Sequence, residues 1–419
     1  MSGPKFYHHP QRKGGNQAEH PAVGAKGDVI QFRGYQKFDL QADGTPVPVE
    51  GNLSRKAGIL GEYLGRYPKE TFMDLGCSNA FFCFMALKKG FKRAFAVDHD
   101  VGYLNNIDRG RRGLPVEPVH TKVDEHFSQR ADVLIAMALI HWIYSCTSCF
   151  GSLDKILGFF ASLVNDYAII EWVDPTDGAI KMFGHLKHNR EFTSEAYTKD
   201  NFLAGLRKHF AAYKKIGNTN NEREIYIAWK RIPFDAFCRE MGVVERPLVD
   251  TEFTGGDEKD KPGTSRILYD VGKQRVLKVY REDLIFKCFE REVFWLKTLE
   301  STGLVPRLLS IDRKRQALEM TWTGEEVTRE NLPENWKEQV QELCKVLEGY
   351  ACRHNDIKPG ELLVKDGKLS LCDWGWGSKG FGGKDLYRYL ELTRECDLYL
   401  TDHILTADAD CDVLLKLFS

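Results

Sequence analysis

Two short stretches of the sequence carry residues whose types and spacing could do chemistry. The first is HNDIKPGELLV, from His354 to Val364, followed by DWG at 373–375. Transfer of a phosphoryl group needs a carboxylate that accepts the proton of a hydroxyl, a cation for the moving phosphate, and acids that hold Mg²⁺. Asp356, Lys358 and Asp373 supply these types of side chain.

The second stretch is TFMDLGCSNA, from Thr71 to Ala80, an apolar strand that runs into a turn of small residues before a helix from about Phe81. Such a turn exposes backbone N–H groups at a helix N-terminus and lets a ligand approach the backbone. It is not a three-glycine fingerprint, so a pyrophosphate is disfavoured. Asp98 ends the next strand, where an acid can accept both hydroxyls of a ribose, and Asp124 could reach an adenine amine.

A strand that ends in Asp or Gly is common in any α/β domain, so it is the order of these acids that favours a site. The order DLGCS, VDHD and ADVLIAMALIHW resembles class I S-adenosylmethionine (SAM)-dependent methyltransferases over about Gly34–Arg231. The resemblance implies a glycine turn under the methionine part, a ribose acid, and two residues beside the adenine. On this sequence these are Asp74, Gly76 and Ser78, then Asp98, then Val123 and Asp124.

Other residues of this region are expected around the same cofactor. Tyr35, Gln36 and Arg55 could form a cap, with Arg55 pairing the cofactor carboxylate; the alternative is packing and a surface charge. Met137 ends the fourth strand, whose edge faces the methyl donor in such folds. His141 follows it and could remove a proton from a hydroxyl, although a lone His is more often structural, and an anionic acceptor requires no base.

The first stretch resembles the H-R-D-x-K-P-x-N and D-F-G motifs of kinases, at a fitting interval. By match of position, Asp356 is the base, Lys358 contacts the γ-phosphate of ATP, and Asp373 binds Mg²⁺. Glu361 stands where kinases place the Asn that holds a second metal ion, and its oxygens also suit Mg²⁺.

Upstream residues agree with a kinase-like domain. Lys278, in the strand Arg275–Tyr280, would grip the phosphates of ATP, and Glu292 on the following helix would hold it; Glu290 is a less favoured partner. The alternative for both Lys278 and Glu292 is a surface charge. The run Leu318–Gly324, which contains Met320, resembles the interlobe hinge whose backbone holds adenine.

Three departures separate this region from protein kinases. Glu361 is longer than Asn and charged, which predicts altered metal use or weak activity. The Gly-rich run at 255–263 is charged and lacks the G-x-G-x-x-G pattern. Residues 374–419 contain no A-P-E and are too few for a full protein-kinase C-lobe, so a minimal lobe of the small-molecule-kinase kind is expected.

The length and composition of the chain limit its possible domain organisation. The 419 residues are too many for one ordinary core, and 42% hydrophobic with 28% charged residues is typical of a globular protein. The predicted divisions are a flexible tail at 1–27, an α/β Rossmann-like methyltransferase domain at 28–232, a linker at 233–250, and an α+β kinase-like domain with a short C-lobe at 251–419. The net charge of −1 gives no strong nucleic-acid signal, and no apolar run is long enough to span a membrane.

The pairing of these domains resembles the bifunctional kinase–methyltransferases that end bacterial O-antigen polysaccharides by phosphorylating a terminal sugar and methylating that phosphate. The resemblance implies a glycan or small-molecule acceptor. Eleven scattered cysteines and a polar N-terminus favour a cytoplasmic protein, peripheral to a membrane only through a partner. Two alternatives stay open: an active methyltransferase with a regulatory or substrate-binding pseudokinase domain, and a non-catalytic scaffold.

Overall fold

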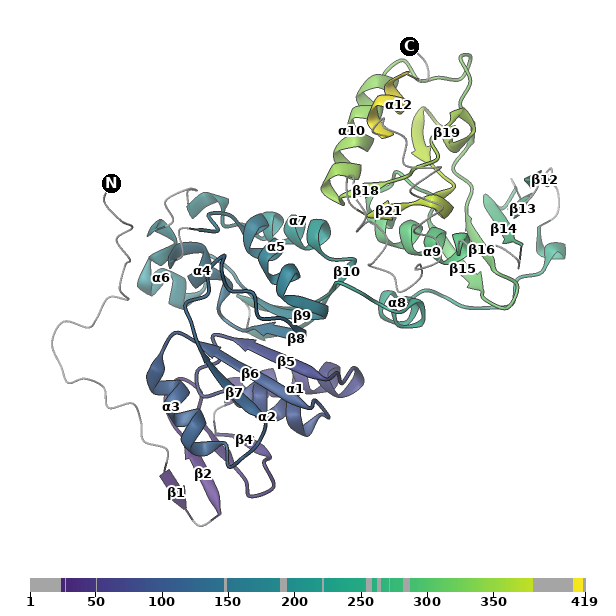
Figure 1. Cartoon of the computed structure of the whole chain (residues 1–419). Helices are drawn as coiled ribbons and strands as arrows, with labels where there is room; N and C mark the ends of the chain where they lie inside the picture. Colours follow the sequence, from purple (N-terminus) through teal and green to yellow (C-terminus); the bar gives the residue numbers. More distant parts are fainter. Residues whose placement is uncertain are drawn as a thin grey trace. The chain divides into compact units, whose positions relative to one another are not determined.

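The computed structural model describes residues 24–26, 28–49, 51–146, 149–188, 194–220, 222–253, 258–261, 265–270, 272–281, 287–379 and 410–416. The chain divides into two compact units, Met1–Lys230 and Arg231–Ser419, and each is described by itself (Figure 1).

A seven-stranded sheet with the order β10-β11-β9-β8-β5-β6-β7 forms the centre of the first unit. The strands β7, β6, β5, β8 and β9 are parallel, whereas β11 is antiparallel to both β9 and β10. The bounds are β5 (Thr71–Leu75), β6 (Arg93–Asp98), β7 (Val116–His120), β8 (Ala131–Ala136), β9 (Val164–Val173), β10 (Ala212–Asn220) and β11 (Arg223–Trp229). This mixed sheet with alternating helices fits the class I methyltransferase fold expected from the sequence.

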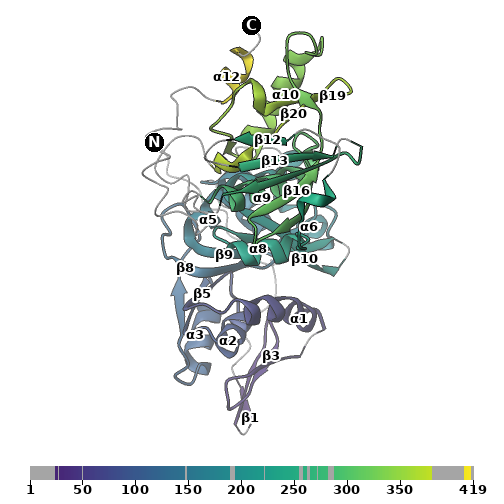
Figure 2. The same cartoon turned by 90° about the vertical axis from the view of Figure 1, so that its right-hand side faces the viewer.

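Helices cover both faces of this sheet (Figures 1 and 2), with α1, α2 and α3 on one face and α5 and α7 on the other. Their bounds are α1 (Gly51–Arg66), α2 (Phe81–Lys88), α3 (Val101–Gly110), α4 (Ile140–Cys146), α5 (Leu153–Leu163), α6 (Gly178–Phe183) and α7 (Lys199–His209), with short 3₁₀ turns η1 (His185–His188) and η2 (Ser194–Ala196). Because both faces are covered, the central strands are apolar and buried along nearly their whole length.

Residues 24–48 form a small antiparallel sheet of four strands: β1 (Gly24–Lys26), β2 (Val29–Phe32), β3 (Phe38–Leu40) and β4 (Pro46–Pro48). Phe32 and Phe38 stack with ring centroids 4.5 Å apart, and both contact Phe84 of α2. The predicted tail at 1–27 is therefore wrong for 24–26, which pair with β2. Residues 1–23 and 27 lie outside the described part of the chain.

In the seven-stranded sheet, β5, β6 and β8 lie within a residue or two of the strands predicted before the turn at Gly76, before Asp98 and before Met137, whereas β7 and β10 were not predicted. The third parallel strand is β7, which ends at His120, three residues before Val123. Pro118 and Glu117 in β7 hide its apolar pattern, and β10 is a polar edge strand with no alternation to detect.

The second unit starts with a five-stranded antiparallel sheet of order β12-β13-β14-β16-β15. Helix α9 follows β14, and a part built from helices and two small sheets comes next. The bounds are α8 (Phe234–Met241), β12 (Glu258–Lys261), β13 (Ser265–Asp270), β14 (Arg275–Tyr280), α9 (Cys288–Leu299), β15 (Leu308–Asp312), β16 (Ala317–Thr321), β17 (Glu325–Glu326), α10 (Trp336–Gly349), β18 (Cys352–Arg353), β19 (Leu362–Lys365), β20 (Lys368–Leu371), β21 (Ser378–Lys379) and α12 (Asp410–Lys416), with 3₁₀ turns η3 (Asp250–Glu252), η4 (Glu300–Thr302), η5 (Pro359–Glu361) and η6 (Trp374–Trp376). This is an α+β unit.

The predicted linker at 233–250 is instead part of the second unit. Helix α8 packs on α9, with the rings of Phe237 and Phe294 4.8 Å apart and those of Phe234 and Phe289 5.9 Å apart. Burial of Phe237, only 1% exposed, explains why this segment does not behave as a solvated connection.

Among the described residues, no helix combines the length and the apolar character that a bilayer crossing requires. The longest is α1, with 16 residues and a polar face.

Candidate active sites

The turn after β5 in the first unit is held open by its own backbone. Gly76, Ser78 and Ala80 all have positive φ, at 70°, 49° and 61°. The amides of Gly76 and Cys77 donate to the carbonyl of Val97, at 2.8 and 3.1 Å. A β-carbon on Gly76 would lie 3.0 Å from the side chain of Leu139, so glycine is the residue that fits here.

Asp98 is tied to this turn. Its carboxylate accepts hydrogen bonds from the amides of Ser78 and Asp100, at 2.9 and 3.0 Å, and lies 3.2 Å from the ring of His99. Burial opposes its ionisation, but these donors, His99 first, outweigh burial and lower the pKa of Asp98. A negative charge is therefore fixed at the carboxyl end of β6.

Several buried polar atoms around the turn have no hydrogen-bond partner among the described residues. They are Asp74 Oδ2, Ser78 Oγ and Asn79 Oδ1, on side chains at most 5% exposed. Burial, and then the charge of Asp98, raise the pKa of Asp74. Orphaned buried polar atoms are costly unless a ligand satisfies them, so this cradle fits a polar cofactor such as SAM.

The three residues predicted to cap the cofactor make different contacts in the structure. The side-chain oxygen of Gln36 accepts from the amide of Phe81 at 3.0 Å, so this group caps α2. Arg55 donates to the carbonyl of Thr219 at 2.8 Å from an exposed position on α1. Tyr35 is 65% exposed. The carbonyl of Gln36 also accepts from the side chain of Asn79 at 2.9 Å, so Gln36 is bonded to the turn after β5, whereas no hydrogen bond within the described part of the chain joins Tyr35 or Arg55 to this turn.

The two residues predicted beside adenine follow β7. Asp124 is half-buried and accepts from the amide of His126 at 2.9 Å, while Val123 packs against the core under the sheet. Met137, 9% exposed, follows the last residue of β8. Their cofactor roles stay predictions.

His141 lies on α4, only 2% exposed, and its Nδ1 has no partner among the described residues. Burial, and then the charges of His185 and Arg223, lower its pKa to about 3. An imidazole that stays neutral down to such a low pH is a weak base, because general-base catalysis works best with a pKa near the working pH. The base role of His141 stays a prediction, and a pKa this low weighs against it.

Two buried ion pairs near this site were not predicted from the sequence. Lys56 on α1 donates to Glu171 of β9 at 2.6 Å, and Glu171 also accepts from Thr219 at 2.8 Å. Arg223 makes two hydrogen bonds to Asp177, at 2.8 and 3.0 Å. The charge of Lys56 acts on both Asp74 and His141.

The position of Lys56 in the sequence could have indicated that it is buried. It lies on the same face of α1 as the buried Leu53 and Leu60, three residues before and four after it. A lysine on an apolar helix face indicates a buried partner.

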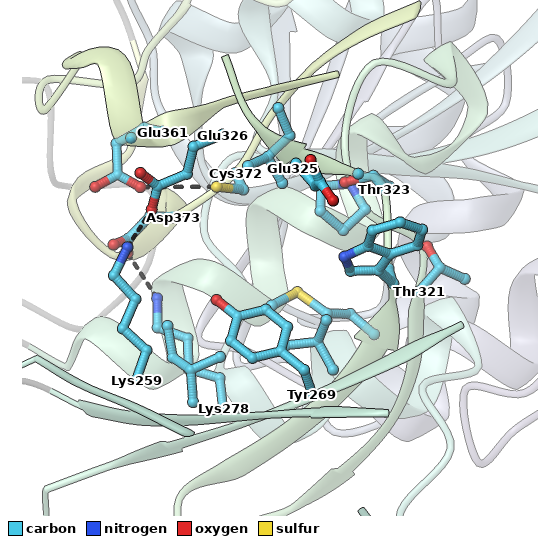
Figure 3. Close-up of a pocket in the computed structure, with 18 of the residues that line it drawn as sticks. Lys259, Tyr269, Lys278, Thr321, Thr323, Glu325, Glu326, Glu361, Cys372 and Asp373 are labelled. Atoms are coloured by element: carbon cyan, nitrogen blue, oxygen red, sulfur yellow. Dashed lines mark hydrogen bonds and ion pairs between the residues drawn. The ribbon is translucent and has the colours of Figure 1, made fainter. Parts of the chain in front are cut away.

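The second unit contains a cavity of about 310 Å³ between its antiparallel sheet and the loops that follow (Figure 3). The lining residues are Lys259, Ile267, Tyr269, Val276, Lys278, Glu292, Pro306, Met320, Thr321, Trp322, Thr323, Gly324, Glu325, Glu326, Gly360, Glu361, Leu363, Cys372 and Asp373. Five of the predicted site residues thus line one cavity: Lys278, Glu292, Met320, Glu361 and Asp373. Its apolar and polar walls suit a nucleotide-sized ligand.

Lys278 is the electrostatic centre of this cavity. Its amine donates to Glu292 at 2.8 Å and to Asp373 at 2.6 Å, and Figure 3 shows it directed at Asp373. Tyr280 also donates to Glu292. Burial disfavours the charged amine, yet the two carboxylates, Asp373 first, raise the pKa of Lys278. The surface-charge alternative is excluded for Lys278 and Glu292, which are 2% and 0% exposed.

Lys358 joins the other two acids. Its amine lies 2.7 Å from Asp356 Oδ2 and 3.2 Å from Glu361 Oε1. Burial opposes its charge, but the bond to Asp356 and the charge of Glu361 raise the pKa of Lys358. Asp356 and Lys358 are thus neighbours, as expected, with Glu361 as a third member.

Buried neighbours fix the loop that carries Asp356. His354, 0% exposed, hydrogen-bonds to the carbonyl of Cys372 at 2.7 Å, and its other ring nitrogen accepts from the amide of Asp356 at 3.4 Å. Asn355, with φ of 67°, donates to the carbonyl of Trp376 at 2.9 Å. These bonds connect the loop to residues on both sides of Asp373.

The predicted hinge begins on β16 and reaches β17. Met320 is 6% exposed in β16 and pairs with Val276 of β14. Gly324 has φ of 121°, and a β-carbon there would collide with the carbonyl of Val364. Glycine is therefore required where the chain passes along the cavity.

The residues present fit a divalent cation that arrives with its own ligands. Asp373 and Glu361 both line the cavity, but no group of three or more His, Cys, Asp or Glu side chains with metal-site geometry occurs among the described residues. Mg²⁺ is usually held by one or two carboxylates plus substrate phosphates, so two acids suffice.

No family model matches the chain, and no curated protein matches it. Among solved structures, it is similar to WbdD, described as a bifunctional kinase-methyltransferase. One WbdD structure is 17% identical over 78% of this chain and 74% of that chain, with a TM-score of 0.34, and a monomeric form is 16% identical over 87% and 91%, also at 0.34.

A magnesium protoporphyrin IX methyltransferase from Synechocystis PCC 6803 is 14% identical over 43% of this chain and 84% of that chain, at 0.32. The likeness in all three is distant, and the function proposed below rests on the residues of the chain itself.

Proposed function

We propose that the chain is a bifunctional enzyme that phosphorylates a hydroxyl of a glycan or small molecule with ATP and Mg²⁺, and then methylates the phosphorylated product with SAM. The observation that carries the kinase half is the buried amine of Lys278, bonded to both Glu292 and Asp373 inside a nucleotide-sized cavity. A lysine held this way between a helix and a metal-binding acid is the arrangement that grips phosphates in kinases.

In the second unit, Mg²⁺-bound ATP would supply an activated phosphoryl group. Asp356 would accept the proton of the acceptor hydroxyl as its oxygen bonds to the γ-phosphorus, while the bond from that phosphorus to the β–γ bridging oxygen breaks and ADP leaves. Lys358 neutralises charge on the moving phosphate, while Asp373 and Glu361 hold the metal. Lys278 orients the remaining phosphates. His354 and Asn355 act indirectly, because their bonds fix the loop.

In the first unit, SAM would supply a methyl group on a sulfonium. The acceptor oxygen forms a bond to the methyl carbon as the carbon–sulfur bond breaks, and the electron pair stays on sulfur. Asp98 would accept the ribose hydroxyls, and Asp74, Ser78 and Asn79 would satisfy the polar atoms of the methionine part. A phosphate is already an anion, so no proton has to move, which agrees with the weak basicity of His141.

The alternative is an active methyltransferase with a regulatory pseudokinase. Its support is that Lys358 is shared between Asp356 and Glu361, and that Glu361 replaces the usual amide. In that case the second unit would bind nucleotide without transferring phosphate.

We also infer a cytoplasmic location, where ATP and SAM are both made. Free buried thiols at Cys77, Cys83, Cys238 and Cys288 support a reducing compartment.

The deciding experiment follows labelled phosphate from ATP to a panel of sugars and oligosaccharides, with Asp356→Ala as the control. Mg²⁺-dependent transfer that the variant loses supports the kinase, and labelled SAM then shows whether the product gains a methyl group. Nucleotide binding without turnover by the wild type would favour the pseudokinase alternative. Absence of both nucleotide and SAM binding would favour a scaffold.

A further inference from the structure

An aromatic cluster of the first unit comes from elements that follow β8 and β9, at the sheet edge where the turn after β5 also lies. The parallel strands β5, β8 and β9 end at one edge of the sheet, and ligands bind at that edge in open α/β folds. Helix α4 starts there after β8, and α6 starts there after β9. Leu139, just before α4, contacts the turn at Gly76. Both α4 and α6 therefore begin at the edge of the sheet that carries the turn after β5.

The cluster consists of Trp142, Phe183 and His185, which we name the aromatic platform. The rings of Trp142 and His185 stack with centroids 4.0 Å apart and 17° between their planes. Phe183 lies 5.6 Å from Trp142 and 6.4 Å from His185. The three side chains come from α4, α6 and η1, so the fold brings them together from separate elements.

Exposure differs across the platform, because His185 is 4% exposed and Trp142 is half-buried, whereas the edge at Phe183 is open to solvent. Phe183 is 44% exposed and its neighbour Met182 is 72% exposed. Among the described residues, the most exposed aromatic side chains are Tyr35 and Phe183. Exposed apolar groups gathered in one place mark a binding surface.

A buried polar side chain, His141, lies beside the platform. His141 is 2% exposed, lies 5.1 Å from His185 between ring centroids, and leaves Nδ1 without a partner among the described residues. The charges of Arg223 and Asp177 both act on it. An aromatic wall with a few polar groups beside it binds ligands that have apolar faces and polar edges.

We propose that the aromatic platform holds the sugar ring of the methyl acceptor against the methyl donor. Sugar rings present patches of C–H groups that stack on aromatic faces, and hydroxyl edges that hydrogen-bond to groups such as His141. The inference rests on the proposed function, since it assumes that the acceptor carries a sugar. It assigns the platform to positioning, so Trp142 and Phe183 move no proton.

The test measures binding of glucose 6-phosphate, glucose and phenyl phosphate to the full chain in the presence of S-adenosylhomocysteine. Saturation-transfer NMR reports which ligand protons touch the protein, and tryptophan fluorescence reports contact with Trp142. The other two tryptophans of the first unit, Trp172 and Trp229, are 1% and 2% exposed. Trp142→Phe should therefore abolish a quenching signal while keeping the aromatic surface.

We expect saturation of the sugar ring protons, and a Kd about tenfold weaker in Phe183→Ala, the size of one lost aromatic contact. The KM of the sugar phosphate should rise similarly, with kcat changed by less than about twofold. S-adenosylhomocysteine affinity should stay unchanged. Val101→Ala, at a 49% exposed position on α3, is the matched control.

Wild-type affinity in both Phe183→Ala and Trp142→Phe, with fluorescence quenching kept in the latter, would overturn the platform. Stronger binding of phenyl phosphate than of the sugar phosphate would overturn its assignment to sugars. Sugar binding that depends on Phe183 without methyl transfer would keep the platform and remove the proposed function. Methylation of sugar phosphates with unchanged KM in Phe183→Ala would keep the proposed function and overturn the platform.

Discussion

The two candidate sites, at each of which we propose that a nucleoside cofactor binds, differ in their electrostatics. At the donor turn of the first unit, the backbone fixes the site, and buried oxygens of Asp74, Ser78 and Asn79 have no partner among the described residues. In the second unit, Lys278 and Lys358 are each bonded to two carboxylates.

This difference predicts how each site responds to its ligand. The donor turn is preorganised, because positive φ angles and amide bonds to Val97 hold it without the cofactor. SAM would add hydrogen bonds and break few. In the nucleotide cavity, Mg²⁺ and phosphates must exchange partners with existing ion pairs, so binding there requires metal and nucleotide together. Single substitutions in either unit can test this contrast.

Lys278→Met should lower phosphoryl transfer about 10³-fold, because a preorganised cation is removed from a buried site. Methylation of a presupplied phosphorylated acceptor should change by less than about twofold, since the donor turn does not depend on Lys278. The measurement compares both transfers in one preparation.

Lys273→Met is the matched control, because Lys273 is an exposed lysine in the turn before β14 that lies 3.6 Å from Asp270. Thermal unfolding separates lost catalysis from lost fold, since Glu292 is left buried beside Asp373 without the lysine. An equal loss of both activities in a folded Lys278→Met protein would contradict independent sites.

Asp98→Asn should weaken S-adenosylhomocysteine binding about 100-fold, measured by calorimetry, because a charged acceptor of hydrogen bonds is lost. The amide also cannot accept from Ser78, Asp100 and a ribose with both of its ends. Asp100→Asn is the control, since an asparagine caps α3 as well as an aspartate does. If the two variants bind alike, Asp98 does not hold the ribose.

The pH dependence of methyl transfer tests whether the acceptor supplies its own charge. A phosphate monoester loses its second proton near pH ~6, so the rate should fall about tenfold from pH 7 to 5 and stay flat above 7. His141, with a pKa of about 3, stays neutral over this range and cannot cause the inflection. His141→Gln should therefore keep the inflection in the pH dependence of the rate. An inflection that disappears in His141→Gln would restore His141 as the base.

Glu361→Gln should raise the Mg²⁺ concentration that half-saturates ATP binding about fivefold, because a carboxylate binds the ion better than an amide. ATP binding followed by calorimetry at several Mg²⁺ concentrations measures this without turnover. Glu325→Gln removes an exposed charge from the same cavity and is the control. Equal shifts in both variants would show that only the overall charge of the cavity matters.

The sequence predicted those parts of the two sites that short motifs encode. The strands that carry Asp74 and Lys278 lie within a residue of their predicted bounds, and the Lys278–Glu292 pair forms as expected. Such local patterns are readable because a strand followed by a turn repeats the same backbone constraint wherever it occurs.

Contacts between distant segments were not readable in this way. Glu171 bonds to Lys56, which lies 115 positions earlier in the chain. Gln36 was expected on the cofactor but caps α2, because its oxygen meets the amide of Phe81 across 45 positions. No local pattern specifies which distant group a polar side chain will meet. The segment after α8 was misjudged for the same reason, since its partners lie on β15 and β16.

The smallest effect is expected for a substitution of Arg55. Its size distinguishes the cofactor role predicted from the sequence from the bond to Thr219 seen in the structure. Arg55 was predicted to pair the cofactor carboxylate, but it donates to the carbonyl of Thr219 from an exposed position, where such bonds contribute little. Arg55→Ala should therefore change S-adenosylhomocysteine affinity by less than about threefold. Arg66→Ala, at the other end of α1, controls for the loss of one helix charge. A loss above about tenfold specific to Arg55→Ala would mean that Arg55 leaves Thr219 to bind the cofactor. The donor site would then also exchange partners on binding, and the contrast between the two units would fail.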